Sequence, residues 1–220
     1  MSQNPHLPAA IYDYMIAHNP PADQLVDELV KETAAMGAIR TMQVGIEQAA
    51  LLAFMVRLVR ARFVVEVGTF TGLSALAMAR ALPADGRLLC CDIDEEYTSV
   101  ARRYWERAGV AERIDLRIAP ALETLRALPS TRSVDLAFVD ADKEGYIHYY
   151  EELVPRLKPS GILIADNLFM NGRVVDEQPD PIALASTAFA RHIQTDPRTE
   201  TVIVPIGDGF SFSRVVSCDH

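Results

Sequence analysis

Oxygen-bearing side chains follow two apolar segments of this 220-residue chain. Asp140 comes directly after the segment 134–139, and Asp166 and Asn167 come directly after the segment 161–165. If both segments are strands of an open α/β sheet, their carboxyl ends meet where such sheets bind ligands. Two carboxylates and an amide oxygen, with no nearby His or Cys, are typical ligands of Mg²⁺, with Mn²⁺ or Ca²⁺ as alternatives. The pattern therefore predicts a divalent-cation site.

A glycine-containing loop follows an earlier apolar segment. Gly68 and Gly72 would let the backbone turn tightly and a ligand approach closely. The loop is not the dinucleotide fingerprint G-x-G-x-x-G, because Phe70 replaces the second glycine. Glu66 would repel a pyrophosphate and attract an ammonium group, and Asp92, further along, is placed for the hydroxyls of a ribose. These features favour S-adenosylmethionine over NAD, although a plain helix-entry turn and a surface aspartate would explain them too.

The elements that would position these residues alternate along the chain. Strands are expected at 63–67, 87–92, 113–118, 134–140 and 161–165, with helices at 73–81, 95–108, 121–128 and 146–157 between them. This order predicts an α/β fold with a parallel sheet and helices on both faces. The last two strands, 201–206 and 210–216, are separated by only three residues, so they are expected to pair as an antiparallel hairpin.

The N-terminal part precedes this alternation. Residues 1–20 are rich in proline and are expected to form an irregular arm, and helices are expected over 23–36 and 46–60. The second helix is apolar nearly all round, which predicts burial by its own domain or by another subunit. We expect one domain over 1–220, with an arm (1–20), N-terminal helices (21–60) and a catalytic α/β core (61–216).

Composition excludes several classes of partner. A formal net charge of −9 argues against nucleic acid or an anionic membrane surface. No apolar stretch approaches the roughly 18 residues of a membrane-spanning helix, and residues 1–6 lack the features of a signal peptide. Cys90, Cys91 and Cys218 form no metal or disulfide framework, so we expect reduced thiols and a cytoplasmic protein.

The order and spacing of four motifs resemble the cation-dependent O-methyltransferases of the caffeoyl-CoA and catechol type. The resemblance covers about residues 36–216. It implies the class I methyltransferase fold, which is Rossmann-like, with a mostly parallel seven-stranded sheet whose last strand is antiparallel, and it makes a homodimer plausible. The motifs are Glu66-x-Gly68-x-x-x-Gly72-x-Ser74, Asp140-Ala141-Asp142-Lys143, Asp166-Asn167 and Gly207-Asp208-Gly209.

The resemblance also implies roles for single residues. It assigns Asp140, Asp166 and Asn167 as metal ligands, Lys143 with Asp140 as the catalytic groups, and Asn171 as a substrate contact. In the acceptor loop 168–175, Met170 stands where plant members carry an aromatic ring, and Phe169 either replaces that ring or belongs to the core. The implied cofactor-binding residues are Met42, Val44, Glu66, Gly68, Ser74, Asp92, Ala121 and Asp142. Ordinary interpretations stay open: Asp140 or Asp142 as a helix cap, Asp166-Asn167 as a turn, and Ser74 or Ala121 as helix-start residues.

The chemistry of such a site can be stated from first principles. A phenolic hydroxyl has a pKa of about 10, so it is a poor nucleophile at neutral pH. A divalent cation stabilises the oxyanion and fixes it in line with the sulfonium methyl. Lys143 could act as general base or as a stabilising cation. The predicted function is cation-dependent O-methylation of a catechol-like or phenolic acceptor. An NAD-dependent oxidoreductase and a non-catalytic cofactor-binding interaction protein are the alternatives.

Overall fold

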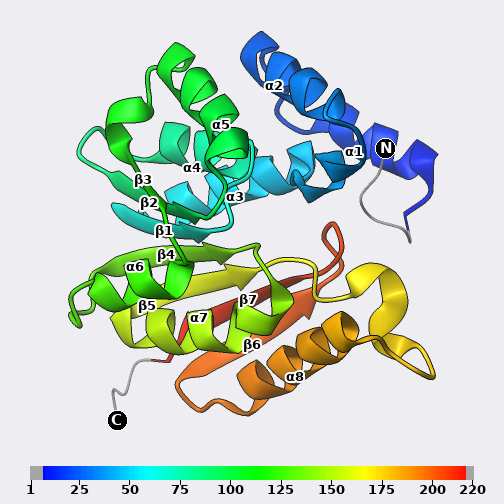
Figure 1. The fold of residues 1–220 in the computed structure, drawn as a ribbon, viewed down its shortest axis with the longest axis vertical. Helices are drawn as coiled ribbons and strands as arrows, with labels where there is room; N and C mark the ends of the chain where they lie inside the picture. The colour runs from blue at the N-terminus through cyan, green and yellow to red at the C-terminus, as the bar shows by residue number, and fades with distance from the viewer. Residues whose placement is uncertain (1–6, 217–220) are drawn as a thin grey trace.

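One mixed sheet organises the computed structural model, which describes residues 7–216. Its strand order is β3-β2-β1-β4-β5-β7-β6 (Figure 1). The strands are β1 (Phe63–Val67), β2 (Arg87–Asp92), β3 (Ile114–Ile118), β4 (Val134–Val139), β5 (Leu157–Ala165), β6 (Thr199–Val204) and β7 (Phe210–Val215). β1 to β5 are parallel, and β7 lies antiparallel between β5 and β6. The predicted parallel sheet and C-terminal hairpin are confirmed.

Helices cover both faces of the sheet, as predicted. α2 (Gln24–Ala34), α3 (Ile46–Leu58), α4 (Leu73–Ala81) and α5 (Glu95–Arg107) pack on one face, and α6 (Ala121–Ala127), α7 (Tyr146–Leu153) and α8 (Pro181–Thr195) on the other (Figure 1). Five short 3₁₀ segments are η1 (Gly37–Met42), η2 (Ala111–Arg113), η3 (Lys143–Gly145), η4 (Val154–Arg156) and η5 (Met170–Val175). Strand residues alternate between the two layers: Val64 packs with α3 to α5, and Val65 packs with α6 to α8.

Aspartates define where three of these helices begin. Asp23 accepts a hydrogen bond from the backbone N–H of Val26 at the start of α2, and Asp94 accepts one from Tyr97 at the start of α5. Asp180 caps α8 in the same way. Each cap satisfies a backbone N–H that has no partner inside the helix, which is why the apolar periodicity turns into a helix at that residue.

The expectation of an irregular N-terminal arm is wrong for residues 9–18, which form α1 (Ala9–His18). Pro8 is the N-cap of this helix, a position where a missing N–H costs nothing. The proline that suggested irregular chain therefore marks a helix start. α1 buries none of its residues, but the Tyr12 hydroxyl donates to Glu47 of α3 at 2.8 Å.

The helix expected at 146–157 is also shorter than predicted. α7 ends at Leu153, because Pro155 in η4 cannot continue the backbone hydrogen bonding of an α-helix. β5 then begins at Leu157, four residues before the expected start. The correction leaves the end of β5 unchanged, so Asp166 still follows the strand directly.

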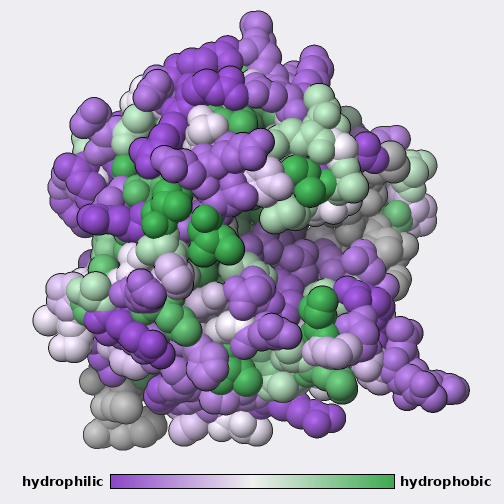
Figure 2. All heavy atoms as spheres, viewed as in Figure 1, coloured by the Kyte–Doolittle hydropathy of each residue, from purple (hydrophilic) through white to green (hydrophobic). Residues whose placement is uncertain are grey.

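Helix α3 is apolar on its outer side as well as its inner side. Leu52 and Val56 are buried, whereas the Phe54 and Leu58 side chains are 56% and 61% exposed. On the face drawn in Figure 2, apolar residues form separate patches between hydrophilic ones. No helix within residues 7–216 has the length and apolar character needed to cross a membrane.

Candidate active site at the carboxyl ends of the strands

A cavity of about 870 Å³ lies at the carboxyl ends of β1, β2, β4 and β5. It is bounded by the loop after β1 and by residues 41–44. The structure brings eleven of the expected site residues to its wall: Met42, Val44, Gly68, Ser74, Asp92, Ala121, Asp140, Asp142, Lys143, Asp166 and Asn167. Glu66 and Asn171, the other two, are not among the residues that line it.

The loop after β1 is anchored on Asp92. The backbone N–H groups of Thr69 and Phe70 both donate to Asp92 Oδ2 at 2.8 Å. Gly68 has a φ of +89°, and a Cβ there would lie 2.0 Å from the carbonyl oxygen of Asp140. Only glycine fits this position, so the loop and the end of β4 are in direct backbone contact.

Glu66 supports this loop from within the protein. Its position on β1 points the side chain into the layer under α4, where it is fully buried. Glu66 Oε2 accepts hydrogen bonds from the Thr69 hydroxyl at 3.0 Å and the Cys90 thiol at 3.3 Å. Burial raises the pKa of Glu66 to about 7. Glu66 Oε1 is buried without a hydrogen-bond partner among residues 7–216.

The expected metal ligands provide two carboxylates with different surroundings. The Asp140 carboxylate makes no hydrogen bond within residues 7–216, whereas Asp166 accepts from the Gln48 amide at 2.8 Å and from the N–H of Asn167 at 2.5 Å. Burial raises the pKa of both carboxyls, and the charge of Asp140 raises that of Asp166 further. Asn167 has a φ of +57°, a left-handed conformation that asparagine tolerates. The site therefore concentrates negative charge where water solvates it poorly.

Lys143 is the cation that faces these carboxylates. It is buried in η3, and its Nζ donates to the backbone carbonyl of Asp166 at 3.0 Å and to Asn167 Oδ1 at 3.4 Å. It also donates to the Tyr146 hydroxyl and lies 4.0 Å from the centre of that ring. Burial lowers the pKa of Lys143, against the effect of Asp140. The ammonium group is thus held against Asp166 and Asn167, two of the three residues expected to bind the metal.

Asp142 both lines the cavity and takes the helix-cap position left open for it, whereas Asn171 of the acceptor loop does not line the cavity. Asp142 caps η3 by accepting from the Gly145 N–H at 2.9 Å, and it accepts from the Tyr149 hydroxyl at 2.6 Å. Asn171 is exposed, and its backbone N–H donates to the Asp208 carboxylate at 2.8 and 2.9 Å. Met170 lines the cavity.

Two aromatic side chains near the site are packing residues. A Cβ on Gly209 would lie 2.8 Å from the Phe169 ring, so that ring packs on the hairpin turn rather than lining the cavity. Trp105 is buried and donates its ring N–H to the Gly72 carbonyl at 3.2 Å. Neither ring is placed as a stacking platform for an acceptor.

Two residues of this site escaped the sequence analysis. Tyr146 stands three positions after Lys143, a spacing that brings helical side chains together, and this signal was present in the sequence. Gln48 is the third residue of an apolar helix, and its partner Asp166 is 118 positions away. No local sequence pattern predicts the contact between Gln48 and Asp166.

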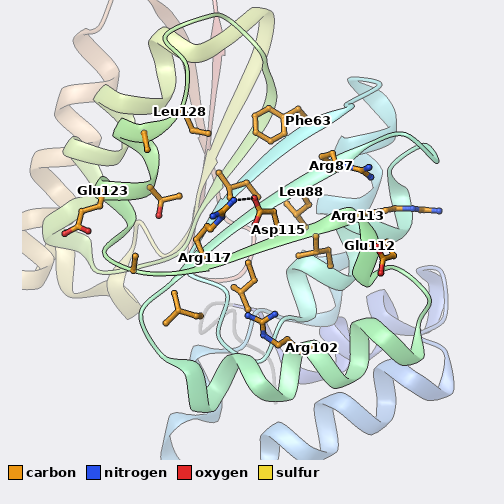
Figure 3. Close-up of a pocket in the computed structure, with 17 residues that line it drawn as sticks. Phe63, Arg87, Leu88, Arg102, Glu112, Arg113, Asp115, Arg117, Glu123 and Leu128 are labelled. Carbon is orange, nitrogen blue, oxygen red and sulfur yellow. Dashed lines mark hydrogen bonds and ion pairs between the residues drawn. The ribbon is translucent and has the colours of Figure 1, made fainter.

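A second cavity, also of about 870 Å³, runs along the edge strand β3 (Figure 3). Its charged lining mixes both signs, with Arg87, Arg102, Arg113 and Arg117 beside Glu112, Asp115 and Glu123. Arg117 is paired with Asp115 at 2.7 Å, and Arg113 donates to the carbonyls of Ala79 and Leu82. Acidic and basic side chains are thus nearly balanced in the edge groove, whereas the charged lining of the strand-end cavity is mostly acidic.

A third candidate is a cluster at the ends of α7 and α8. One ligand atom from each of Glu151, His192 and Asp196 lies within 4.8 Å of the others, a spacing that could hold a metal ion. The guanidinium of Arg198 already bonds both Glu151 and Asp196 at 2.6 Å. Arginine thus occupies the place of a cation, and the cluster is a structural ion-pair network.

Comparisons with known proteins identify relatives over nearly the whole chain. The profile of a family described as "O-methyltransferase" matches residues 17–216. The chain is 35% identical to catechol O-methyltransferase domain-containing protein 1 of Mus musculus, over 89% of this chain and 79% of that protein. It is 33% identical to caffeoyl-CoA O-methyltransferase 2 of Eucalyptus globulus, with 94% and 89% covered. The solved O-methyltransferase from Bacillus cereus in complex with SAH superposes with a TM-score of 0.85 at 27% identity, covering 94% of this chain and 97% of that one.

Proposed function

The chain belongs to the O-methyltransferase family, and from that premise we propose that a divalent cation assists it in methylating a hydroxyl of a small catechol-like or phenolic acceptor. It is an S-adenosylmethionine-dependent enzyme, as its family and its SAH-bound structural relative indicate. The finer assignment rests on one observation. Asp140 and Asp166 are desolvated carboxylates that face a cavity, and among residues 7–216 Lys143 is the one cationic side chain in its lining.

The residues present fit a hard divalent cation. Asp140 keeps its oxygens free of hydrogen bonds within residues 7–216, and Asn167 offers an amide oxygen beside Asp166. Carboxylate and amide oxygens without sulfur suit Mg²⁺ best, with Mn²⁺ and Ca²⁺ next. A cation held there would supply positive charge that lowers the pKa of an acceptor hydroxyl. These residues would also orient that hydroxyl.

The methyl donor would lie along the loop after β1. Gly68 allows close approach of the backbone, and Asp92 stands at the end of β2, where an acid can meet a ribose. Met42 and Val44 would cover the methionine end of the methyl donor. Glu66 would act indirectly, because its carboxylate holds Thr69 within the loop.

Lys143 would handle charge or protons at the acceptor oxygen. Its ammonium is fixed by the Asp166 carbonyl and the Tyr146 hydroxyl, so it has one defined direction. Because burial lowers the pKa of Lys143, a neutral amine that accepts the acceptor proton is less costly than at the surface. A protonated Lys143 would instead stabilise the oxyanion.

The charge of the cavity favours a neutral acceptor. Its charged lining is Asp92, Asp140, Asp142, Lys143, Glu144 and Asp166, five acids against one base. An acceptor with several phosphate charges would be repelled, even with a divalent cation bound. Adjacent hydroxyls of a catechol could chelate the cation, and Met170 supplies an apolar wall. We therefore rank simple catechols and flavonoids above hydroxycinnamoyl-CoA esters.

The test is methyl transfer with a defined metal content. The purified protein is stripped with EDTA, and S-adenosylmethionine is supplied with catechols, flavonoids or hydroxycinnamoyl-CoA esters under mass-spectrometric detection. We expect activity only after Mg²⁺ or a similar ion is restored. Full activity of the stripped enzyme would reject the proposal that a cation assists the reaction. No product across the panel would favour the non-catalytic alternative.

The NAD-dependent alternative receives no support from the family. Calorimetric titration separates it, since we expect S-adenosylhomocysteine to bind and NADH not to bind. Binding of NADH without binding of S-adenosylhomocysteine would favour the NAD-dependent alternative instead.

We also propose a homodimer and a cytoplasmic location. Phe54 and Leu58 leave an apolar strip of α3 exposed, which a second subunit could cover. Light scattering at the mass of a single chain would reject the dimer. Cys90 and Cys91 are free buried thiols, as expected in a reducing compartment, whereas Cys218 lies outside the described residues.

A further inference from the structure

Gln48 is a fully buried polar side chain in the mostly apolar helix α3. Both ends of its amide are used. Nε2 donates to Asp166 Oδ2 at 2.8 Å, and Oε1 accepts from the backbone N–H of Gly45 at 2.7 Å. The opposite orientation would set oxygen against oxygen and N–H against N–H, so the two neighbours determine how the amide points.

The space around this amide is closed. Gly207, in the turn between β6 and β7, has a φ of +55°, and a Cβ there would lie 2.4 Å from Gln48 Nε2. The backbone of that turn therefore packs directly on the amide. In such close packing, Gln48 cannot move without moving Asp166 or Gly45.

The 42–45 segment joins Gln48 to the expected cofactor site. Met42, Gln43 and Val44 line the cavity. The Gln43 amide donates to the Thr33 hydroxyl at 2.9 Å and to the Thr71 hydroxyl at 3.0 Å. Thr71 belongs to the loop after β1, so one end of the segment is attached to that loop. The other end is attached, through Gly45 and Gln48, to Asp166.

We propose that Gln48 is a positioning residue that couples cation binding at Asp166 to binding of the methyl donor under the 42–45 segment. The inference rests on the proposed function, because it requires the cation site. A cation on Asp166 would fix that carboxylate, which holds the Gln48 amide and, through it, the Gly45 N–H. The segment then loses less freedom when the donor binds, and the two affinities rise together.

Calorimetry on the wild-type protein is the first test. S-adenosylhomocysteine is titrated with and without MgCl₂, and MgCl₂ is titrated with and without S-adenosylhomocysteine. We expect each ligand to tighten the binding of the other by about fivefold or more, by the same factor in both directions. Binding of both without any mutual effect would overturn the inference and leave the proposed function intact. Failure of Mg²⁺ to bind in either state would instead overturn the cation itself.

The Gln48→Met variant tests the residue. Methionine has a similar length but forms neither hydrogen bond, so Mg²⁺ affinity should fall by about 10- to 100-fold. The mutual effect of Mg²⁺ and S-adenosylhomocysteine should disappear. The matched control is Gln43→Met, which removes the hydrogen bonds to Thr33 and Thr71 and leaves the contact between Gln48 and Asp166 in place. This variant should weaken the binding of S-adenosylhomocysteine equally with and without Mg²⁺. The factor by which Mg²⁺ tightens that binding, the coupling factor, should stay at the wild-type value. A wild-type coupling factor in Gln48→Met would overturn the proposal.

A measurement on the wild type covers the case in which Gln48→Met does not fold. The Gly45 amide proton is donated to Gln48, so its hydrogen exchange reports the strength of that contact. Mg²⁺ should slow exchange at Gly45 more than at Gly109, a turn glycine with no neighbour that its Cβ would meet. Equal exchange with and without Mg²⁺ would contradict the proposed connection.

Discussion

Two charged clusters flank helix α7, and they differ in whether the fold neutralises them. The strand-end cluster consists of Asp140, Asp166 and Lys143, and the helix-end cluster consists of Glu151, His192, Asp196 and Arg198. In the first, burial raises the pKa of both carboxyls. In the second, hydrogen bonds from Arg198 lower the pKa of Asp196 to about 2 and lower that of Glu151.

The difference teaches how to separate a binding site from a structural ion-pair network. Arg198 brings a planar guanidinium that satisfies two carboxylates at once, so the helix-end cluster is complete. Lys143 donates its hydrogen bonds to a backbone carbonyl, an amide oxygen and a hydroxyl, and none of them goes to a carboxylate. Asp140 and Asp166 therefore retain charge that an added cation could balance.

The largest effect is expected from Asp140→Ala. Loss of a carboxylate ligand removes charge stabilisation worth several kcal/mol, so kcat/KM should fall about a thousandfold. S-adenosylhomocysteine binding, measured by calorimetry, should largely survive. Asp196→Ala is the matched change in the helix-end cluster and should leave turnover near wild type. Equal losses in both variants would remove the distinction between the clusters.

Lys143→Met should have the next largest effect. Removal of a general base or of a cation beside the oxyanion should lower kcat about a hundredfold, measured under saturating substrates. Lys31, an exposed lysine on α2, is the control, and Lys31→Met should be unchanged. If the Lys143 variant retained full kcat, the role assigned to its ammonium group would be wrong.

Stability should respond with opposite signs in the two clusters. In EDTA, Asp140→Asn removes a half-buried charge that makes no hydrogen bond within residues 7–216 and should raise Tm, whereas Asp196→Asn breaks the pairing with Arg198 and should lower it. Each change should be about 1 kcal/mol, or roughly 2–4 °C for a protein of this size. Differential scanning fluorimetry decides between opposite and equal signs, and equal signs would contradict the comparison.

The smallest predicted effect concerns acid. The folded pKa of Asp196, about 2, lies below its ordinary value of 3.8. Its ionised form therefore stabilises the fold above about pH 4, and that contribution is lost as the pH falls toward 2. Allowing for solvent screening, it is about 1 kcal/mol. In urea unfolding, wild type should exceed Asp196→Asn at pH 5, and the gap should shrink by pH 3. A constant gap would show that Asp196 does not act through its charge.

The sheet was predictable because its signals are local. The segments 63–67 and 134–139 are short and apolar, with residues that alternate between two packed layers. The link between the last two strands, three residues in the prediction and five residues (205–209) in the structure, is too short for a parallel crossover. Pro8 misled the prediction for residues 9–18, because proline occurs both in irregular chain and at helix starts.

The site was predictable only in part, because its contacts are distant in sequence. Asp140, Asp166 and Asn167 were found from the ends of their strands. The burial of Glu66 follows from strand alternation, yet its partner Cys90 lies on another strand. Gln48 meets Asp166 only after α3 has packed against the sheet. Side chains of this kind carry no signature that a sequence pattern can show.

The contact between Gly68 and the Asp140 carbonyl has a consequence for how acceptor preference could change. Because two backbones touch there, the spacing between the loop after β1 and the end of β4, where we propose the donor and the cation, does not depend on side chains elsewhere in the cavity lining. Met170 and Ile182 are two such side chains. An engineer could diversify both positions without altering the alignment on which transfer depends. In this architecture, new acceptor specificities are accessible by changing side chains of the cavity lining alone.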